Sequence, residues 1–218
     1  MAKGIASPKR LWGSKPKLRF RGIRKRLLAL HADLFDIDAQ VKRPSSYYSS
    51  EITPLEKMII VLEDRRFFDH FGVDFRSIIR ELAKLMTFRR HGGASTIDMQ
   101  LVRTITGYKE LTFQRKIYEC LLATIIQRRY SKIRILRTYL NCAFFGSHLI
   151  GASKASELMF RVAPDHLSNE QAAFIAAMLV CPRPTHPTEQ WQSRIQRRAN
   201  YGYSIYINNK DRFDQHPC

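Results

Sequence analysis

Apolar residues recur at helical spacing along most of the chain, and the clearest run begins at residue 53. Thr53 and Glu56 have the spacing of a capping box, in which each side chain bonds to the backbone N–H of the other residue. The apolar positions after them share one face of a helix. These positions are Leu55, Met58, Ile59 and Leu62. The pattern predicts a helix that docks on a core and ends where the apolar stripe stops, at Glu63.

Five later segments show the same helical periodicity, each with its own start signal. They are a helix capped by Asp74 that carries Phe75, Ile78, Ile79, Leu82 and Leu85, a helix capped by Ser95, a helix over residues 115–129 with Leu121, Leu122, Ile125 and Ile126 inward, a helix that starts at Ser131, and a helix from Ser168 to Leu179. No two segments alternate with a period of two around a hairpin turn. We therefore predict a mainly α fold.

The length and composition fit one folded domain with a tail at each end. The chain has 218 residues, and 44% of them are hydrophobic, which is enough for a core. Ser and Tyr residues follow Pro44 and are typical of a linker. We expect a loosely ordered arm and linker over residues 1–50, a folded domain over 51–200 and a tail over 201–218.

The charge of the chain is strongly positive and is concentrated near the N-terminus. Thirty-seven Lys and Arg stand against nineteen Asp and Glu, which gives a net charge of +18. Residues 1–26 hold ten of the basic side chains, and the first acidic residue is Asp33. Such an excess favours a polyanionic partner, which can be nucleic acid, anionic lipid or a phosphate-bearing substrate. The arm is typical of a segment that binds an anionic surface, although a solvated tail without function fits the same residues.

The cysteines and the hydrophobic runs exclude several classes of site. No two cysteines have C-x-x-C spacing, so we expect no structural zinc and infer no disulfide. The cysteines are Cys120, Cys142, Cys181 and Cys218, and the first two are expected to be small core residues. No segment approaches the roughly 20 apolar residues that cross a bilayer. The apolar run at residues 27–30 is too short for a signal peptide, so no export or anchoring segment is visible in the sequence.

The charged run from Glu63 to His70 carries the first candidate chemistry. It places Glu63 and Asp64 at the end of the predicted helix, with Arg65 and His70 close by in sequence. Carboxylates at the end of an apolar stripe can face a cleft, where neighbouring charges adjust their proton affinity, as in a general acid or base. A charged helix end with solvated side chains fits the same residues.

Four motifs follow one another along the chain in an order that resembles one family. They are the segment from Glu63 to His70, the segment Gly92-Gly93-Ala94-Ser95-Thr96-Ile97-Asp98-Met99-Gln100-Leu101-Val102-Arg103, the segment from Arg115 to Glu119 followed by Ser131-Lys132 and Tyr139-Leu140-Asn141, and Phe144-Phe145-Gly146 with Gly151-Ala152. This order resembles the peptidoglycan glycosyltransferase (transglycosylase) domain, glycosyltransferase family 51, which occurs in class A penicillin-binding proteins and monofunctional biosynthetic transglycosylases. The resemblance covers about residues 52–198. It implies a lysozyme-like α fold and, because no segment remains for a transpeptidase domain, a monofunctional form.

The resemblance also implies a processive polymerase that joins lipid II, a lipid-linked disaccharide-peptide, into glycan strands. Glu63 matches the family's catalytic base, which takes the proton from the acceptor sugar's 4-hydroxyl as that oxygen attacks C1 of the donor. Glu119 matches its second acidic residue, and we expect the two carboxylates to converge on one groove, as in glycosidases. Basic side chains are expected to hold the departing diphosphate. The substrate-binding residues implied are Asp64, Arg65, Phe67, Arg80, Ser95, Thr96, Gln100, Arg103, Arg115, Lys116, Lys132 and Asn141.

Several of these residues also have a structural interpretation. Ser95 fits a helix N-cap, Lys132 a surface charge and Asn141 a helix C-cap. Arg103 stands where the family usually has Lys, and a planar guanidinium holds a phosphate differently from the point charge of an ammonium. The resemblance implies no certain cofactor, and the candidate is a divalent cation, Mg²⁺ or Mn²⁺, near Glu119.

Functions of three classes fit the sequence. The first is the glycosyltransferase, which implies lipid II, the growing glycan strand and an anionic membrane surface under the basic arm as partners, at the outer face of the cytoplasmic membrane. The second is a lysozyme-like hydrolase, in which water replaces the acceptor sugar and the cluster of Arg103, Arg115 and Lys116 is not needed. The third is an inactive family member that binds lipid or nucleic acid. We do not expect nucleic acid as a partner, because a binding protein has no need for both carboxylates.

Overall fold

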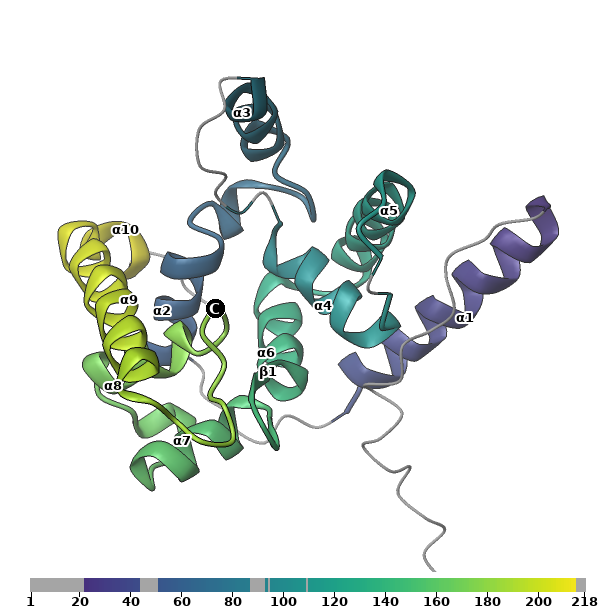
Figure 1. Cartoon of the computed structure of the whole chain (residues 1–218). Helices are drawn as coiled ribbons and strands as arrows, with labels where there is room; N and C mark the ends of the chain where they lie inside the picture. Colours follow the sequence, from purple (N-terminus) through teal and green to yellow (C-terminus); the bar gives the residue numbers. More distant parts are fainter. Residues whose placement is uncertain (1–21, 44–50, 87–92, 94, 109, 215–218) are drawn as a thin grey trace, which may run out of the picture.

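The computed structural model describes residues 22–43, 51–86, 93, 95–108 and 110–214, and the described chain is mainly α-helical, as predicted (Figure 1). Its helices and strands are α1 (Ile23–Val41), α2 (Pro54–Glu63), the 3₁₀ turn η2 (Phe67–Asp69), α3 (Phe75–Met86), α4 (Ile97–Thr106), α5 (Phe113–Arg129), α6 (Lys132–Cys142), β1 (Phe144–Gly146), β2 (Leu149–Ile150), α7 (Ala152–Phe160), the 3₁₀ turn η3 (Pro164–His166), α8 (Asn169–Ala177), α9 (Glu189–Asn208) and α10 (Lys210–Asp214). This architecture is consistent with the lysozyme-like α fold that the sequence predicted.

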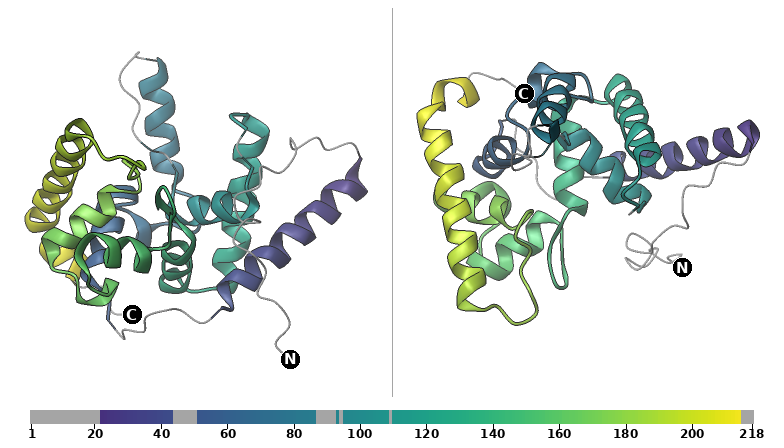
Figure 2. Two further views of the ribbon diagram at one scale, coloured as in Figure 1. Left: turned by 60° about the horizontal axis from the view of Figure 1, so that its bottom comes forward. Right: turned by 45° about the horizontal axis from the view of Figure 1, so that its top comes forward.

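Two groups of helices lie on either side of α6 (Figures 1 and 2). In one group α2 packs against α8 and α9, and α7 packs against α8. In the other group α4 packs against α1, α5 and α6. The long helix α9 runs along the outer side of the first group, and α3 and the first half of α1 project from the body of the molecule (Figure 1). The end of α2 and the start of α4 therefore face each other between the two groups.

The capping box at the start of α2 is confirmed. The backbone N–H of Thr53 donates to Glu56 Oε2 over 2.8 Å, and the backbone N–H of Glu56 donates to Thr53 Oγ1 over 3.3 Å. Leu55, Met58 and Ile59 are fully buried. This apolar face fixes α2 against the core, and so fixes the position of the residue that ends it.

Other helix starts and faces were predicted with mixed success. Ser131 caps α6, and Ser168 forms its capping box with Gln171 at the start of α8, as expected. The expected cap at Ser95 is wrong, because Thr96 is the N-cap of α4. Leu121, expected to face inward, and two of the apolar residues that follow Asp74 are exposed. These two are Phe75 and Ile79 of α3, at 69% and 66% exposure, and Leu121 of α5 is 47% exposed.

A small hairpin, which the sequence did not predict, follows α6. Strands β1 and β2 are antiparallel, with Phe144 opposite Ile150 and Gly146 opposite Leu149. Gly146 has a φ of 148° and lies against the backbone of Arg183, where a Cβ atom would collide. Glycine is needed there because only it tolerates both the conformation and the close approach. The hairpin strands are too short to show an alternating pattern.

Both ends of the folded domain extend beyond the predicted limits. The expected loosely ordered arm contains α1, which packs on the body through buried Ile37 and Val41. Asp33 Oδ2 accepts hydrogen bonds from the hydroxyls of Tyr108 and Tyr118 over 3.2 and 2.9 Å. At the other end, α9 and α10 are helical through the expected tail as far as residue 214. The basic segment 1–21 lies outside the described residues.

The structure tests part of what was expected of the cysteines and of membrane-spanning segments. Cys142 is buried, as expected of a core residue, whereas Cys120 is half-buried. The thiols of Cys120, Cys142 and Cys181 are free, and Cys218 lies outside the described residues. Within the described part of the chain, every helix is too short or too polar to span a bilayer.

Candidate active site

Glu63 is the last residue of α2, and the buried face of that helix fixes where its side chain points. Asp64 leaves the helical conformation, with φ −155° and ψ 74°, so the chain turns away directly after Glu63. The side chain of Glu63 is 12% exposed and lies where two hollows of the surface adjoin. A carboxylate with this limited access to solvent can exchange a proton with a molecule bound in either hollow.

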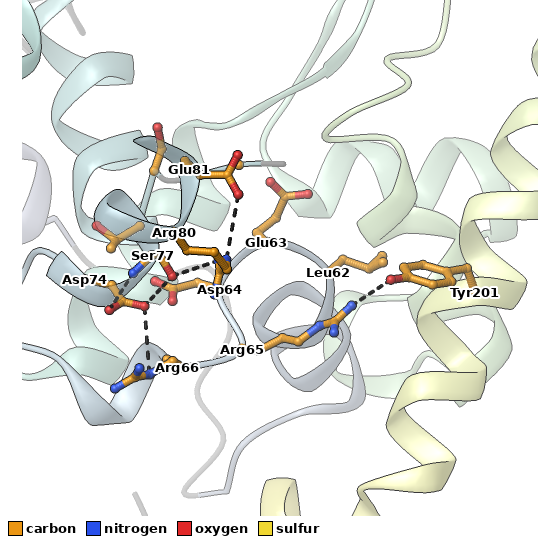
Figure 3. Close-up of a pocket in the computed structure, with 13 residues that line it drawn as sticks. Leu62, Glu63, Asp64, Arg65, Arg66, Asp74, Ser77, Arg80, Glu81 and Tyr201 are labelled. Atoms are coloured by element: carbon orange, nitrogen blue, oxygen red, sulfur yellow. Dashed lines mark hydrogen bonds and ion pairs between the residues drawn. The ribbon is translucent and has the colours of Figure 1, made fainter. Parts of the chain in front are cut away.

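The two hollows share Glu63 and Ser95 and are otherwise lined by different elements. The first, called here the α3 hollow, has a volume of about 530 Å³, and its lining is shown in Figure 3. Its lining includes Arg65, Arg66, Ser77, Arg80, Thr96 and Tyr201. The second, the α5 hollow, has a volume of about 570 Å³. Its lining includes Gln100, Arg103, Arg115, Tyr139, Phe144 and Pro182. The α5 hollow has two arginines and one carboxylate in its lining. In the α3 hollow the three arginines stand beside four carboxylates, which are Glu63, Asp64, Asp74 and Glu81.

Three side chains from three helices hold Glu63 in place. Gln100 Nε2 donates to Glu63 Oε2 over 3.2 Å, and Arg198 Nη2 donates to Glu63 Oε1 over 3.1 Å. The hydroxyl of Tyr139 donates to Gln100 Oε1 over 2.5 Å. Burial raises the pKa of Tyr139 far above its ordinary value, so the phenol stays a neutral donor. Because Tyr139 occupies the amide oxygen of Gln100, the amide nitrogen is left to face Glu63.

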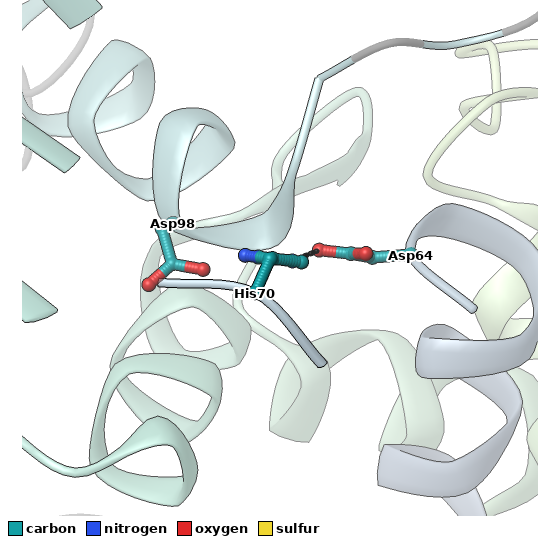
Figure 4. Close-up of side chains that lie close together, drawn as sticks. All are labelled: Asp64, His70 and Asp98. Carbon is teal, nitrogen blue, oxygen red and sulfur yellow. Dashed lines mark hydrogen bonds and ion pairs between the residues drawn. The ribbon is translucent and has the colours of Figure 1, made fainter. Parts of the chain in front are cut away.

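Asp64 is buried and points toward His70, in a polar layer that also holds Asp98 (Figure 4). Its Oδ2 accepts the backbone N–H of Ile97 over 3.1 Å and lies 3.0 Å from His70 Nε2. The first of these bonds ties the end of α2 to the first turn of α4. Asp64 therefore helps to fix the distance between Glu63 on α2 and Gln100 on α4.

Lys132 also belongs to this buried polar layer. Its Nζ lies 2.9 Å from Asp98 Oδ2 and 3.4 Å from His70 Nδ1, and it stands 4.6 Å from the centre of the Phe67 ring. Burial raises the pKa of Asp98 and lowers that of Lys132, and the attraction within the pair opposes both shifts. Phe67 is fully buried. Lys132 and Phe67, expected to bind substrate, line neither hollow and lie in the layer below.

Glu119 is enclosed by two arginines. Arg103 bonds to both of its oxygens, from Nε to Oε1 over 2.9 Å and from Nη2 to Oε2 over 3.1 Å. Arg115 Nη1 also donates to Oε1. The side chain of Glu119 is 1% exposed and lines neither hollow. The expectation that Glu63 and Glu119 face one groove is therefore wrong for Glu119, because the arginines that line the α5 hollow cover it.

Ser95 gathers the basic side chains at the start of α4. Its Oγ accepts from Lys116 Nζ over 2.7 Å and from Arg103 Nη2 over 3.4 Å. Burial lowers the pKa of Lys116, and the nearby Glu119 opposes this shift. Thr96 is buried, where its hydroxyl accepts from the backbone N–H of Met99 and donates to Gly72 O over 2.7 Å. The structure thus brings together the predicted basic cluster, and it gives Thr96 a structural role.

The other predicted substrate residues divide between the α3 hollow and a separate hollow. Arg65 Nη2 donates to the Tyr201 hydroxyl over 2.9 Å, and Arg80 Nη2 donates to Ser77 Oγ over 3.0 Å, both at the α3 hollow (Figure 3). Asn141 lines a separate hollow of about 140 Å³ and neither of the two beside Glu63. The predicted role of Asn141 in substrate binding does not fit this position.

Sequence reasoning missed the contribution of α9. Trp191, Ile195 and Ala199 form the buried stripe of this helix, and Arg198 lies at its edge. A charged residue beside a buried stripe is the signal that was available, because such a residue needs a partner to offset its desolvation. The motifs ended before α9, so neither Arg198 nor Tyr201 was singled out.

Comparison with known proteins decides the family. The chain matches the family Transglycosylase over residues 34–204. It belongs to the transglycosylase family. It is 35% identical over 153 residues to penicillin-binding protein 1A of Rickettsia bellii, a match that covers 68% of this chain and 19% of that protein. It is also 33% identical over 154 residues to the biosynthetic peptidoglycan transglycosylase of Shewanella frigidimarina, covering 66% of this chain and 68% of that protein.

A third relative of this transglycosylase is penicillin-binding protein 2a of Streptococcus pneumoniae, with 35% identity over 144 residues. That match covers 66% of this chain and 19% of the relative. The chain thus spans about a fifth of the length of the penicillin-binding proteins that it matches. It spans about two thirds of the biosynthetic transglycosylase.

Proposed function

We propose that this chain is a peptidoglycan glycosyltransferase that polymerises lipid II into glycan strands. The observation that carries the proposal is the position of Glu63, which lines both hollows beside Ser95 in a chain of the transglycosylase family. Two hollows on either side of one carboxylate offer separate places for a donor and an acceptor sugar. The names of the relatives support the same activity.

In the proposed reaction Glu63 acts as the general base. Its carboxylate takes the proton from the 4-hydroxyl of the acceptor sugar, and that oxygen forms a bond to C1 of the donor. The bond between C1 and the diphosphate oxygen breaks, and the lipid diphosphate leaves with the bonding electron pair. Gln100 and Arg198 each hold one oxygen of Glu63, so the base meets the hydroxyl in a fixed orientation. General base catalysis of this kind contributes about 10²- to 10⁴-fold.

The leaving diphosphate is proposed to bind beside Ser95. Arg103 and Lys116 converge there, at the junction of the two hollows, and Arg80 also lines the α3 hollow. Negative charge on the diphosphate grows as the bond to C1 breaks. A positioned cation that meets such charge stabilises the transition state by about 3 kcal/mol.

We also propose that the protein works on a membrane surface, at the outer face of the cytoplasmic membrane. The first half of α1 supports this, because Ile23, Leu27 and Leu28 are exposed beside basic side chains at residues 24–26. Helices with apolar and basic faces bind anionic interfaces. Deletion of residues 1–26 is expected to weaken binding to anionic vesicles and to reduce its salt dependence. Unchanged binding would contradict this part of the proposal.

Two other functions predict different outcomes. A hydrolase would place water, and not a sugar hydroxyl, beside Glu63, and it would shorten finished glycan. An inactive family member would bind lipid or nucleic acid without turnover. The cluster of Arg103, Arg115 and Lys116 favours the transferase, because a diphosphate leaving group needs cations and a glycan leaving group does not.

A polymerisation assay with fluorescent lipid II tests the proposal. The native protein is expected to produce glycan strands, and Glu63→Gln is expected to lose at least about 100-fold of the rate. Glu157→Gln is the matched control, because Glu157 is exposed on α7 and distant from the site in sequence and fold. Equal activity of native protein and Glu63→Gln would overturn the role of Glu63. Shortening of finished glycan would support the hydrolase instead.

A further inference from the structure

The surroundings of Glu119 do not fit a divalent cation. Both of its oxygens accept hydrogen bonds from guanidinium groups, and its side chain is 1% exposed. Mg²⁺ needs an octahedral shell of oxygen ligands and usually keeps several of its waters. An enclosed carboxylate whose lone pairs face two arginines offers neither the ligands nor the space.

Among the described residues, Glu119 belongs to no group of three His, Cys, Asp or Glu side chains that could share a metal ion. Among them, one group of His, Cys, Asp and Glu has the spacing to hold a metal ion, and it consists of Asp64, His70 and Asp98 (Figure 4). Glu119 is not part of this group. A cation already lies beside this group, because the ammonium of Lys132 is 2.9 Å from Asp98 Oδ2 and 3.4 Å from His70 Nδ1. Neither place favours a divalent ion.

The residue type at position 103 accounts for the enclosure of Glu119. A guanidinium is a rigid fork that bonds to both oxygens of a carboxylate at once, as Arg103 does. The lysine that the family usually has here carries a single ammonium, which acts as a point charge. The fork is therefore a feature of this chain that a lysine at position 103 would not reproduce.

The net charge around Glu119 and the exposure of its two arginines show what Arg103 contributes. Two arginines and one carboxylate carry a net charge of +1 without a metal ion. Arg115 is 7% exposed, whereas Arg103 is 40% exposed and lines the α5 hollow. Arg103 also reaches Ser95 through Nη2 over 3.4 Å. One guanidinium thus contacts Glu119 and faces the position proposed for the diphosphate.

We propose that the Arg103 guanidinium takes the place of a divalent cation at Glu119, so that this chain stabilises the leaving diphosphate with side-chain cations alone. Glu119 is then a positioning residue that orients Arg103. The effect on turnover rests on the proposed function, whereas the statement about metal binding does not. The two can therefore fail separately.

Titration with Mn²⁺, followed by electron paramagnetic resonance of the folded full chain, tests metal binding without turnover. The native protein and Glu119→Gln are expected to give the same signal, because no Mn²⁺ binds at Glu119. Arg103→Gln is expected to gain bound Mn²⁺, and the double variant Arg103→Gln/Glu119→Gln to lose it again. Arg128→Gln, an exposed position on the same helix as Glu119, is the matched control and should behave as native. Circular dichroism verifies that each variant is folded.

Polymerisation of lipid II tests the consequence for turnover. The native protein is expected to keep its rate in excess EDTA. Arg103→Gln is expected to lose about 100-fold and to regain at least about tenfold when Mn²⁺ is added. Arg103→Lys, which keeps a cation but lacks the fork, should fall between them and become sensitive to EDTA.

Two results would overturn the proposal. One is bound Mn²⁺ in the native protein that Glu119→Gln removes. The other is the absence of bound Mn²⁺ in folded Arg103→Gln, which would mean that the guanidinium does not occupy a cation's place. A native protein without polymerase activity but with the expected Mn²⁺ results would reject the proposed function and keep the assignment at Glu119.

Discussion

Arg198 Nη2 lies 3.1 Å from Oε1 of Glu63, in a bond that joins residues 135 positions apart in the chain. Gln100 holds the other oxygen of the same carboxylate. A charge-assisted hydrogen bond is shorter and stronger than a neutral one, so the pair fixes the rotamer of Glu63. The orientation of the Glu63 carboxylate thus depends on α9 as much as on its own helix.

Replacing Arg198 is expected to reduce turnover more than substrate binding. Arg198→Gln should lower kcat by roughly tenfold and leave KM within about twofold, because Arg198 contacts the base and lines neither hollow. Arg198→Lys should recover part of the loss, since it retains the charge. Steady-state polymerisation kinetics measure both constants. Arg197→Gln is the neighbouring exposed control, and an equal loss in that variant would contradict a specific role for Arg198.

The hydroxyl of Tyr139 is expected to act through Gln100. Tyr139→Phe removes the donor to Gln100 Oε1, so the amide loses its fixed orientation toward Glu63. We expect a loss of about 1 kcal/mol in the free energy of unfolding and a several-fold lower kcat. A double-mutant cycle with Gln100→Ala measures the coupling. Additive effects of the two substitutions on kcat would show that the two side chains act independently.

Breaking the buried pair of Lys132 and Asp98 is expected to destabilise the fold. Lys132→Met leaves the carboxylate of Asp98 without its cation in a buried site, which costs roughly 3–5 kcal/mol. Adding Asp98→Asn should recover part of this loss, because the uncompensated charge is removed. Urea unfolding measures both variants. Lys154→Met, on the exposed face of α7, is the control, and a similar loss there would reject the explanation.

Asp74 is expected to make the fold sensitive to acid. Burial raises the pKa of Asp74, but hydrogen bonds from Ser77 and the charge of Arg66 outweigh this, so its pKa is below the ordinary value of 3.8. The stabilisation is therefore complete above that value and is lost as the pH falls through the lowered pKa. Asp74→Asn keeps a neutral cap that does not titrate.

Denaturant unfolding between about pH 5 and about pH 2 compares the free energy of unfolding of the native protein with that of Asp74→Asn. The native protein should lose more stability than Asp74→Asn over this interval, because only the native protein takes up a proton at position 74. Equal losses in both proteins would mean that the cap of α3 does not contribute to acid sensitivity.

Helix starts were predictable because their signals are local. The capping boxes at Thr53 and Ser168 each involve residues three positions apart, and the structure has both. The apolar stripe also placed Glu63 at the end of α2, and the resemblance identified the basic residues that meet at Ser95. Interactions between near neighbours in sequence are fixed by the residues themselves, so pattern and structure agree there.

Contacts between distant segments were harder to predict. Periodicity showed that Phe75 and Ile79 share a face of α3, but it could not show that the face lacks a partner within the described chain. The motif order placed Glu119 near the site, but it could not show that Arg103 and Arg115 cover its oxygens. Which side chain covers another depends on packing across the fold, and a single sequence does not record it.

At Gly202 the C-terminal half of α9 packs closely against the end of α2. A Cβ atom at this position would lie 2.9 Å from the side chain of Leu62, so the absence of a side chain lets α9 approach the residue that precedes Glu63. One position earlier, Tyr201 accepts the hydrogen bond of Arg65. A shortened chain that stops at residue 200, where sequence patterns placed the domain boundary, would sever α9 in mid-helix and remove Tyr201 from the lining of the α3 hollow.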